Sequence, residues 1–402
     1  MTPSLASRAR SLWQGEPGAA RTPLWLDCDT GHDDAFALLV AAHAPCLDLL
    51  GISTTHGNAP LEQTTANTLS ILTAISRTSI AVYPGSSHPI CRSPCFAPDI
   101  HGSSGLDGTT CLPPPSTSPV PTPSAIQSAY SALISTPPNT AYIIATGTLT
   151  NIALLFLTYP SLASHIRGLH IMGGAIGSSF TTAPLGTISA SPSSAPTASP
   201  AESRFGNWTP YAEFNIYADP EAAASVFRNP ILASKIMLAP LDLSHLFLAT
   251  SDIQHSLLHG FDGPVTAPAP APVSVSVSPD AQPSKVRTLF NEILTFFATT
   301  YADVFGLTDG PPLHDVLPVL AVLAPGIFDD KDGERFEVEV VIDGAHGTDG
   351  VARTESRVGQ TVVRPVGKGG QGGVRIPRAV EGEVAWRIVD LCLGEAERVA
   401  TW

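Results

Sequence analysis

The sequence has few charged residues and, in particular, few positive ones. Only 14% of its 402 residues are charged, and 21 lysines and arginines stand against 35 aspartates and glutamates, giving a net charge of −14. Binding to phosphate backbones requires a cationic surface, so this balance argues against nucleic acid as the main partner. Hydrophobic residues make up 43% of the chain, which is enough for a sizeable core.

Long hydrophobic runs and a regular set of cysteines are also missing. No stretch of 18 or more residues is apolar, so no transmembrane helix and no membrane association are expected. Six irregularly spaced cysteines argue against a disulfide framework. We therefore expect a cytoplasmic protein. Residues 1–22 lack the apolar core of a secretory signal and are expected to form a flexible N-terminal extension.

Short apolar segments alternate with helical patterns along the chain, and each segment ends in a polar turn. The segments are residues 24–26, 47–54, 80–83, 140–145, 170–172 and 235–238. This alternation predicts an α/β fold with an open, mostly parallel central sheet and helices on both faces, similar to a Rossmann fold. Because ligands of such sheets bind beyond the carboxyl ends of the strands, the polar turns are expected to form the site.

Three stretches rich in proline, serine, alanine and threonine interrupt the alternation. They lie at 113–123, 178–200 and 264–283. Segments of this composition bury too little apolar surface to order themselves, so we expect low-complexity insertions there. No polar linker separates two independent cores, and residues 23–402 are therefore expected to form a single domain.

Four aspartates crowd the turn after the first predicted strand. Asp27, Asp29, Asp33 and Asp34 lie within eight residues of one another. Carboxylates at one strand end repel each other, and a hard cation such as Ca²⁺, with its many oxygen ligands, relieves this repulsion. A helix N-terminus also favours acidic residues, but it would account only for Asp33 and Asp34. The turn is therefore predicted to hold a metal ion.

Two other metal-dependent motifs fit this turn less well. An EF-hand loop needs glycine at its sixth position and glutamate at its twelfth, whereas Gly31 is fifth from Asp27 and no glutamate stands at the twelfth position. Phosphatases of the haloacid dehalogenase type also have Asp-x-Asp after a strand. The pair Asp33 and Asp34 has no role in that scheme, so a Mg²⁺-dependent phosphatase is the least favoured of the alternative functions.

The turn resembles the opening motif of the inosine–uridine nucleoside hydrolase family, and further motifs follow in family order. They are DCDTGHDDA at 27–35, GN at 57–58, HGSSGL at 101–106, TGTLTNIA at 146–153, MGG at 172–174, AEFN at 212–215 and HD at 314–315. Thr30 stands where many members have proline, and the tail after Asp343 matches loosely. So many ordered motifs make chance agreement negligible.

This resemblance implies an enzyme that hydrolyses the N-glycosidic bond of ribonucleosides to ribose and free base, with one Ca²⁺ ion. It implies that Ca²⁺ is bound by Asp29, Asp34, Asp315 and the backbone carbonyl of Thr146. Asp29 would also accept a proton from the attacking water, and His314 would donate one to the leaving base. The transition state would resemble an oxocarbenium ion.

The resemblance also implies a set of substrate-binding residues. The ribose hydroxyls would be held by Asp33, Asn58, Asn207, Glu213 and Asn215. Glu213 and Asn215 share one face if their segment is extended. His101 and Phe214 are candidate contacts on the side of the base, whereas Tyr301 is interpreted as a core aromatic residue.

The expected partner is a small nucleoside of the salvage pathway, and family members are commonly dimers or tetramers, so a homo-oligomer is expected. The sequence leaves open whether purine or pyrimidine bases are preferred. The alternative hypothesis is a non-catalytic nucleoside- or ribose-binding protein of the same fold. The joint presence of Asp29, Glu213, His314 and Asp315 argues against that alternative.

Overall fold

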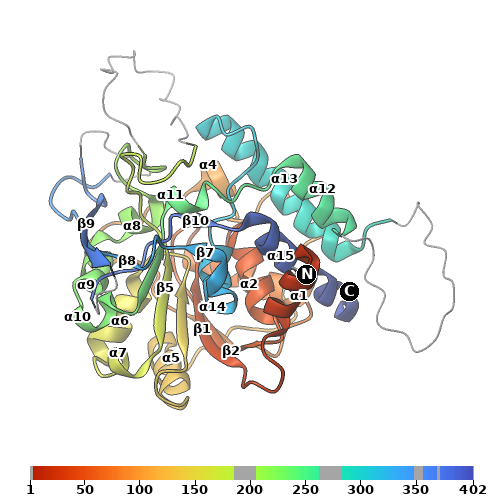
Figure 1. Cartoon of the computed structure of the whole chain (residues 1–402), viewed down its shortest axis with the longest axis horizontal. Helices are drawn as coiled ribbons and strands as arrows, with labels where there is room; N and C mark the ends of the chain where they lie inside the picture. The colour runs from red at the N-terminus through yellow and green to blue at the C-terminus, as the bar shows by residue number, and fades with distance from the viewer. Residues whose placement is uncertain (1–2, 185–204, 262–281, 348–355, 369–371, 402) are drawn as a thin grey trace.

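The computed structural model describes residues 3–184, 205–261, 282–347, 356–368 and 372–401, and statements about absence refer to these residues. Its centre is a six-stranded parallel sheet of order β3-β2-β1-β4-β5-β6 (Figure 1). The strands are β1 (Thr22–Cys28), β2 (Leu47–Thr54), β3 (Val82–Pro84), β4 (Tyr142–Ala145), β5 (Gly168–Met172) and β6 (Ile236–Ala239). The predicted α/β class and all six predicted strands are confirmed.

Alternate strand residues pack into two hydrophobic cores, one on each face of the sheet. Leu24, Leu26 and Ile144 belong to one core, whereas Trp25 and Ile143 belong to the other. The first core also takes residues from α2 (Asp34–His43), α3 (Leu61–Ala74), α12 (Ser251–His259), α13 (Lys285–Phe305), α14 (Val316–Leu323) and α15 (Gly382–Val399). The second core takes them from α5 (Ala125–Ile134), α6 (Thr150–Thr158), α7 (Leu162–His165), α9 (Pro220–Phe227) and α10 (Pro230–Ala233).

Smaller elements complete the chain. An antiparallel pair, β8 (Glu334–Val340) and β9 (Thr361–Lys368), packs its inward side chains into the second core. The remaining elements are α4 (Pro98–His101), α8 (Phe214–Ala218), α11 (Leu241–Ser244), the 3₁₀ helix η1 (Pro325–Ile327), β7 (Phe328–Asp329) and β10 (Ala379–Val380). No described helix combines the length and hydrophobicity needed to cross a bilayer.

The N-terminal segment differs from the flexible extension that we expected for residues 1–22. Helix α1 (Leu5–Gln14) forms there, and Ser4 caps it by accepting a hydrogen bond from the Ser7 backbone. Leu12, Trp13 and the fully buried Ala9 join the first core, and the helix lies against α15 (Figure 1). The apolar positions therefore form a helical stripe that the composition alone did not reveal.

Only one of the three predicted insertions is fully described. Residues 113–123 form a loop, and the Val120 backbone donates a hydrogen bond to the Val82 carbonyl at 2.8 Å. The predicted insertions at 178–200 and 264–283 lie mostly outside the described residues.

Candidate active site

A cavity opens beyond the carboxyl ends of the central strands, where the sequence predicted a site. Its free space, including solvent at the mouth, is about 480 Å³. Two groups of side chains matter here. The acidic cluster consists of Asp29, Asp33, Asp34 and Asp315, of which Asp33 and Asp315 line the cavity. The aromatic wall consists of His101, Trp208, Phe214, Phe297, Tyr301, Phe305 and His314.

The acidic cluster is buried and closely spaced. Asp33, Asp34 and Asp315 each offer an oxygen within 4.8 Å of the others. Asp33 and Asp315 stand at the N-terminal caps of α2 and α14, but neither side chain makes a capping hydrogen bond. Helix capping therefore does not explain these two carboxylates, which leaves their oxygens available to a ligand.

Asp29 and Asp34 are held beneath the cavity by their neighbours. Asp34 accepts hydrogen bonds from the Gly31 backbone at 2.8 Å and from the Thr146 hydroxyl at 2.8 Å. Asp29 Oδ2 accepts from the Asn58 backbone at 2.8 Å, whereas Asp29 Oδ1 is buried without a hydrogen-bond partner. A Cβ atom at Gly147 would lie 2.6 Å from Asp29 Oδ1, so glycine permits this approach.

The buried carboxylates of the acidic cluster repel one another, so a positive charge beside them would stabilise their ionised forms. Burial, followed by repulsion from Asp34, raises the pKa of Asp29 well above its usual value and that of Asp33 to about 8. Burial and its acidic neighbours raise the pKa of Asp315 in the same way. No lysine or arginine occurs among the described residues that line the cavity. A hard divalent cation fits this all-oxygen set and the unpartnered Asp29 Oδ1.

The carbonyl of Thr146, the fourth predicted ligand, lines the cavity after β4. Asn215 donates its side-chain amide to this carbonyl at 2.7 Å. A carbonyl oxygen has two lone pairs, so this bond leaves one free for a cation. The same contact fixes the orientation of Asn215 beside the acidic cluster.

The predicted ribose contacts also line the cavity, and two of them, Glu213 and Asn215, stand at the start of helix α8 rather than on a strand. Glu213 caps α8, and its carboxylate accepts hydrogen bonds from the backbones of Asn215 at 2.8 Å, Ile216 at 3.0 Å and Gly174 at 2.8 Å. These capping bonds favour the helical turn over a strand. Asn207 accepts from the Phe214 backbone at 2.9 Å. The polar side chains are thus fixed before any substrate binds.

His314 does not face the cavity with a free nitrogen. Its Nε2 lies 2.7 Å from the Tyr301 hydroxyl and its Nδ1 lies 2.7 Å from the Ser244 hydroxyl. Burial lowers the pKa of His314 well below its usual value and raises that of Tyr301 well above, so both are neutral. The Tyr301 hydroxyl therefore stands between His314 and the cavity as a possible proton donor.

His101 lies on α4, and its Nδ1 is 3.1 Å from Nδ1 of His32. The His32 ring stacks against Phe296 and Phe297, with ring centres 4.9 and 5.5 Å apart. Burial lowers the pKa of His32 to about 4 and that of His101 well below its usual value. The His101 ring therefore packs against His32 and Phe297.

The cavity brings together most of the residues expected from the sequence. Its lining includes Asp33, Asn58, His101, Thr146, Asn207, Glu213, Phe214, Asn215, His314 and Asp315, whereas Asp29 and Asp34 lie buried behind it. Sequence reasoning did not identify Trp208, Phe297 and Phe305, and it treated Tyr301 as core. The spacing of 297, 301 and 305 along α13 places the three rings on one helix face, but a core helix has the same spacing, so the sequence does not distinguish the two.

Comparisons with known proteins agree with this geometry. The family model described as inosine-uridine preferring nucleoside hydrolase matches residues 24–387. The chain is 35% identical to the uridine nucleosidase of Saccharomyces cerevisiae over 307 residues, 76% of each protein. It is also 35% identical to the pyrimidine-specific ribonucleoside hydrolase RihA of Escherichia coli over 306 residues, 76% of this chain and 81% of that protein.

Solved structures with the same fold include two nucleoside hydrolases. A purine-preferring ribonucleoside hydrolase from Gardnerella vaginalis superposes with a TM-score of 0.68 at 22% identity, covering 92% of this chain and 99% of that one. The plant nucleoside hydrolase PpNRh1 gives a TM-score of 0.68 at 23% identity, covering 94% and 99%. At these identities the likeness establishes the fold alone.

Proposed function

Because the chain belongs to the inosine-uridine preferring nucleoside hydrolase family, we propose that it is a Ca²⁺-dependent enzyme that cleaves the N-glycosidic bond of ribonucleosides with water. The observation that carries this proposal is the acidic cluster. Three buried carboxylates lie within 4.8 Å of one another, two in the lining of a cavity and one behind it, and the described lining has no lysine or arginine. Such a group is stable only with a cation or with bound protons.

The cation would be held by Asp29, Asp34, Asp315 and the Thr146 carbonyl. Asp33, predicted as a ribose contact, has an oxygen within 4.8 Å of those of Asp34 and Asp315, so it would stand beside the cation where a ribose hydroxyl binds. When bound, a divalent cation lowers the pKa of water and orients the hydroxyl groups of a sugar. Asp29 Oδ1 has no hydrogen-bond partner and is the atom that would accept the proton of the attacking water.

The ribose would be oriented by side chains that the protein holds rigidly. Asn58, Asn207, Glu213 and Asn215 line the cavity, and backbone hydrogen bonds fix Glu213 and Asn207. Negative charge close to the anomeric carbon would stabilise an oxocarbenium-like transition state. A site that satisfies each sugar hydroxyl would reject substrates that lack one.

The leaving base would receive its proton on the side of the aromatic wall. His314 Nε2 is engaged by the Tyr301 hydroxyl at 2.7 Å, so Tyr301 would give its own hydroxyl proton to the base and recover one from solvent, and neutral His314 would hold that hydroxyl in place. This refines the role that the sequence resemblance implied for His314. The aromatic rings around this hydroxyl offer flat surfaces on which a base can stack.

Uridine is the first substrate to test. Two relatives at 35% identity are named as a uridine nucleosidase and a pyrimidine-specific ribonucleoside hydrolase, which supports a pyrimidine preference for this chain. We propose further that the enzyme acts in nucleoside salvage in the cytoplasm as a homo-oligomer. These three features rest on the family and on the composition, and they could be checked by localisation and light scattering.

The decisive experiment is release of free ribose by the purified protein. We expect turnover of uridine with Ca²⁺, loss of turnover after treatment with a chelator, and recovery when Ca²⁺ is added back. Parallel reactions with inosine, cytidine and adenosine would define the base preference. Calorimetric binding of uridine without any ribose release would instead favour the nucleoside-binding alternative, and hydrolysis of an aryl phosphate with Mg²⁺ would favour a phosphatase.

A further inference from the structure

One wall of the cavity is carried by a loop with little core of its own. The wall loop, defined here as residues 85–101, connects β3 to the end of α4 and brings Ala97, Ile100 and His101 to the cavity. Between Gly85 and His101 only three side chains besides His101 are buried, namely Pro89, Cys95 and Ala97. Segments with few buried apolar contacts open easily, so the position of this loop depends on its polar anchors.

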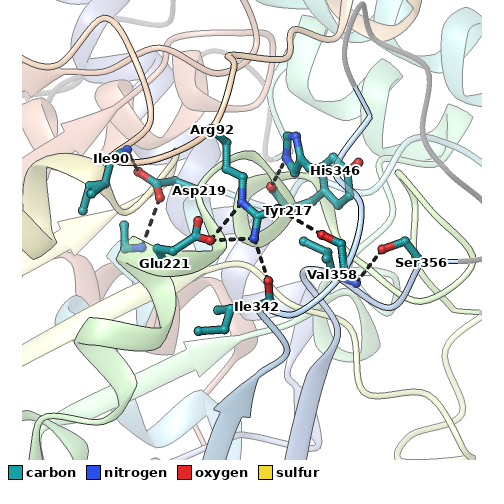
Figure 2. A network of polar contacts seen from close by, with 11 residues as sticks. Ile90, Arg92, Tyr217, Asp219, Glu221, Ile342, His346, Ser356 and Val358 are labelled. Carbon is teal, nitrogen blue, oxygen red and sulfur yellow. Dashed lines mark hydrogen bonds and ion pairs between the residues drawn. The ribbon is translucent and has the colours of Figure 1, made fainter.

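Arg92 is the main polar anchor in the outer half of the loop. Its guanidinium donates to Glu221 Oε1 from Nε at 2.9 Å and from Nη2 at 2.6 Å (Figure 2). It also donates to the carbonyl of Ile342 at 2.6 Å and to the carbonyl of Gly344 at 3.3 Å. One side chain thus joins the wall loop, helix α9 and the segment after β8.

Two further contacts lie beside this junction, one from the wall loop to the start of α9 and one from the segment after β8 to α8. The Ile90 backbone donates to Asp219 Oδ2 at 2.9 Å, and Asp219 also caps α9 by accepting from the Ala222 backbone (Figure 2). On the opposite side, His346 Nε2 lies 3.0 Å from the Tyr217 carbonyl, and the two rings stack with centres 4.3 Å apart. Tyr217 belongs to α8, the helix that carries Asn215.

The chemistry of arginine suits this junction. The Arg92 and Glu221 side chains are 18% and 22% exposed, so their ion pair is screened less than a surface pair. A planar guanidinium can reach a carboxylate and two carbonyls at once, whereas a lysine ammonium is a single point charge on a flexible stem. Removal of Arg92 would also leave Glu221 without this partner and free the outer part of the loop.

We propose that Arg92 is a positioning residue that holds the wall loop, and with it His101, in the arrangement that receives the nucleobase. This inference rests on the proposed function, because it assigns the wall loop to the base. Arg92 does not line the cavity, and its hydrogen bonds go to Glu221 and to the segment after β8 rather than to the acidic cluster. Its removal should therefore weaken recognition of the base and leave recognition of the ribose unchanged.

The test compares Arg92→Ala with wild type and with Arg375→Ala. Arg375 is a matched control, since its ion pair with Asp330 has similar exposure, 19% and 25%, and does not touch the wall loop. We expect Arg92→Ala to raise the KM for uridine about five- to tenfold, with a smaller change in kcat and less than about a twofold change in inhibition by free D-ribose. Arg375→Ala should leave all three values close to wild type.

Hydrogen–deuterium exchange provides a readout that does not depend on turnover. Amides of residues 85–101 should exchange faster in Arg92→Ala than in wild type or Arg375→Ala. Unchanged exchange would overturn the proposal, and so would an equal loss of affinity for uridine and ribose. If wild type released no ribose, the proposed function would fail, but exchange and calorimetric binding of uridine and ribose would still decide the role of Arg92.

Discussion

The acidic cluster and the aromatic wall meet in one cavity, but the chain builds them differently. Three of the four acidic residues follow β1 directly, and the fourth stands at the start of α14. The wall draws its rings from α4, α8, α13 and the segments before α8 and α14, with no strand contributing directly. The chemistry is thus tied to the central sheet, whereas contacts to the base depend on helices and loops that can vary independently.

The strongest test of this division is removal of one ligand from the acidic cluster. We expect Asp315→Asn to lower kcat/KM for uridine by about a thousandfold or more, because about 4 kcal/mol of transition-state stabilisation is lost with the cation. Ribose release at several uridine concentrations would measure the effect. Asp48→Asn is the control, because Asp48 is half exposed and pairs only loosely with Arg21.

The same substitution should lower activity but raise the stability of the protein when no divalent cation is present. Without a divalent cation, Asp315→Asn should have a higher Tm than wild type, because it removes one of three carboxylates crowded within 4.8 Å. Added Ca²⁺ should raise the Tm of wild type more than that of the variant. A variant that is less stable than wild type in chelator would contradict a cluster built around a cation.

The aromatic wall is tested next by Tyr301→Phe, which removes only the hydroxyl that lies 2.7 Å from His314. We expect kcat for uridine to fall about 10- to 100-fold, as for loss of a general acid. A riboside with a 4-nitrophenoxide leaving group needs no proton, so its hydrolysis should fall by less than about threefold. Rates measured side by side on both substrates separate the two effects.

Tyr142→Phe is the matched control for this substitution, because the Tyr142 hydroxyl accepts a hydrogen bond from Arg167 far from the cavity lining. It should leave both rates unchanged. An equal loss on both substrates in Tyr301→Phe would mean that Tyr301 supports the fold of the wall rather than delivering a proton. The aromatic wall would then have no chemical role separate from that of the acidic cluster.

Sequence reasoning was most successful where function is encoded in a continuous motif. The order of apolar segments predicted all six strands. The acidic turn at 27–34 predicted a metal site, and the family resemblance added Asp315, whose carboxylate lies with those of Asp33 and Asp34. Close spacing after a strand leaves little freedom for the side chains, so the local pattern was sufficient. Burial of Asp29 behind the cavity depends on contacts with Gly57 and Gly147, which no local pattern reveals.

The aromatic wall could not be predicted in the same way. Phe297 and Tyr301 have the apolar spacing of any core helix, and only the tertiary packing turns this face toward the cavity. The shared face expected for Glu213 and Asn215 in an extended segment does not apply, because the Glu213 side chain caps α8. Long-range contacts of this kind, such as Arg92 with Ile342, carry no signal in a single sequence.

The smallest expected effect concerns acid stability on the side of the wall. His245 packs against the His314 ring, its Nδ1 lies 3.0 Å from the Pro184 carbonyl, and its Nε2 is buried without a hydrogen-bond partner. Burial lowers the pKa of His245 from 6.5 to about 4. The unfolded chain therefore takes up a proton first, and the stability contributed by neutral His245 is lost as pH falls from 6.5 toward 4.

His245→Asn removes this titration while keeping an N–H donor for the Pro184 carbonyl. The slope of unfolding free energy against pH should become shallower by up to about 1.4 kcal/mol per pH unit between pH 6.5 and 4, with little change in activity at pH 7.5. Urea unfolding at pH 7, 6 and 5 measures the slope. A variant whose slope equals that of wild type would show that His245 is already protonated in the folded protein over this pH range. Water would then reach His245 in spite of its burial.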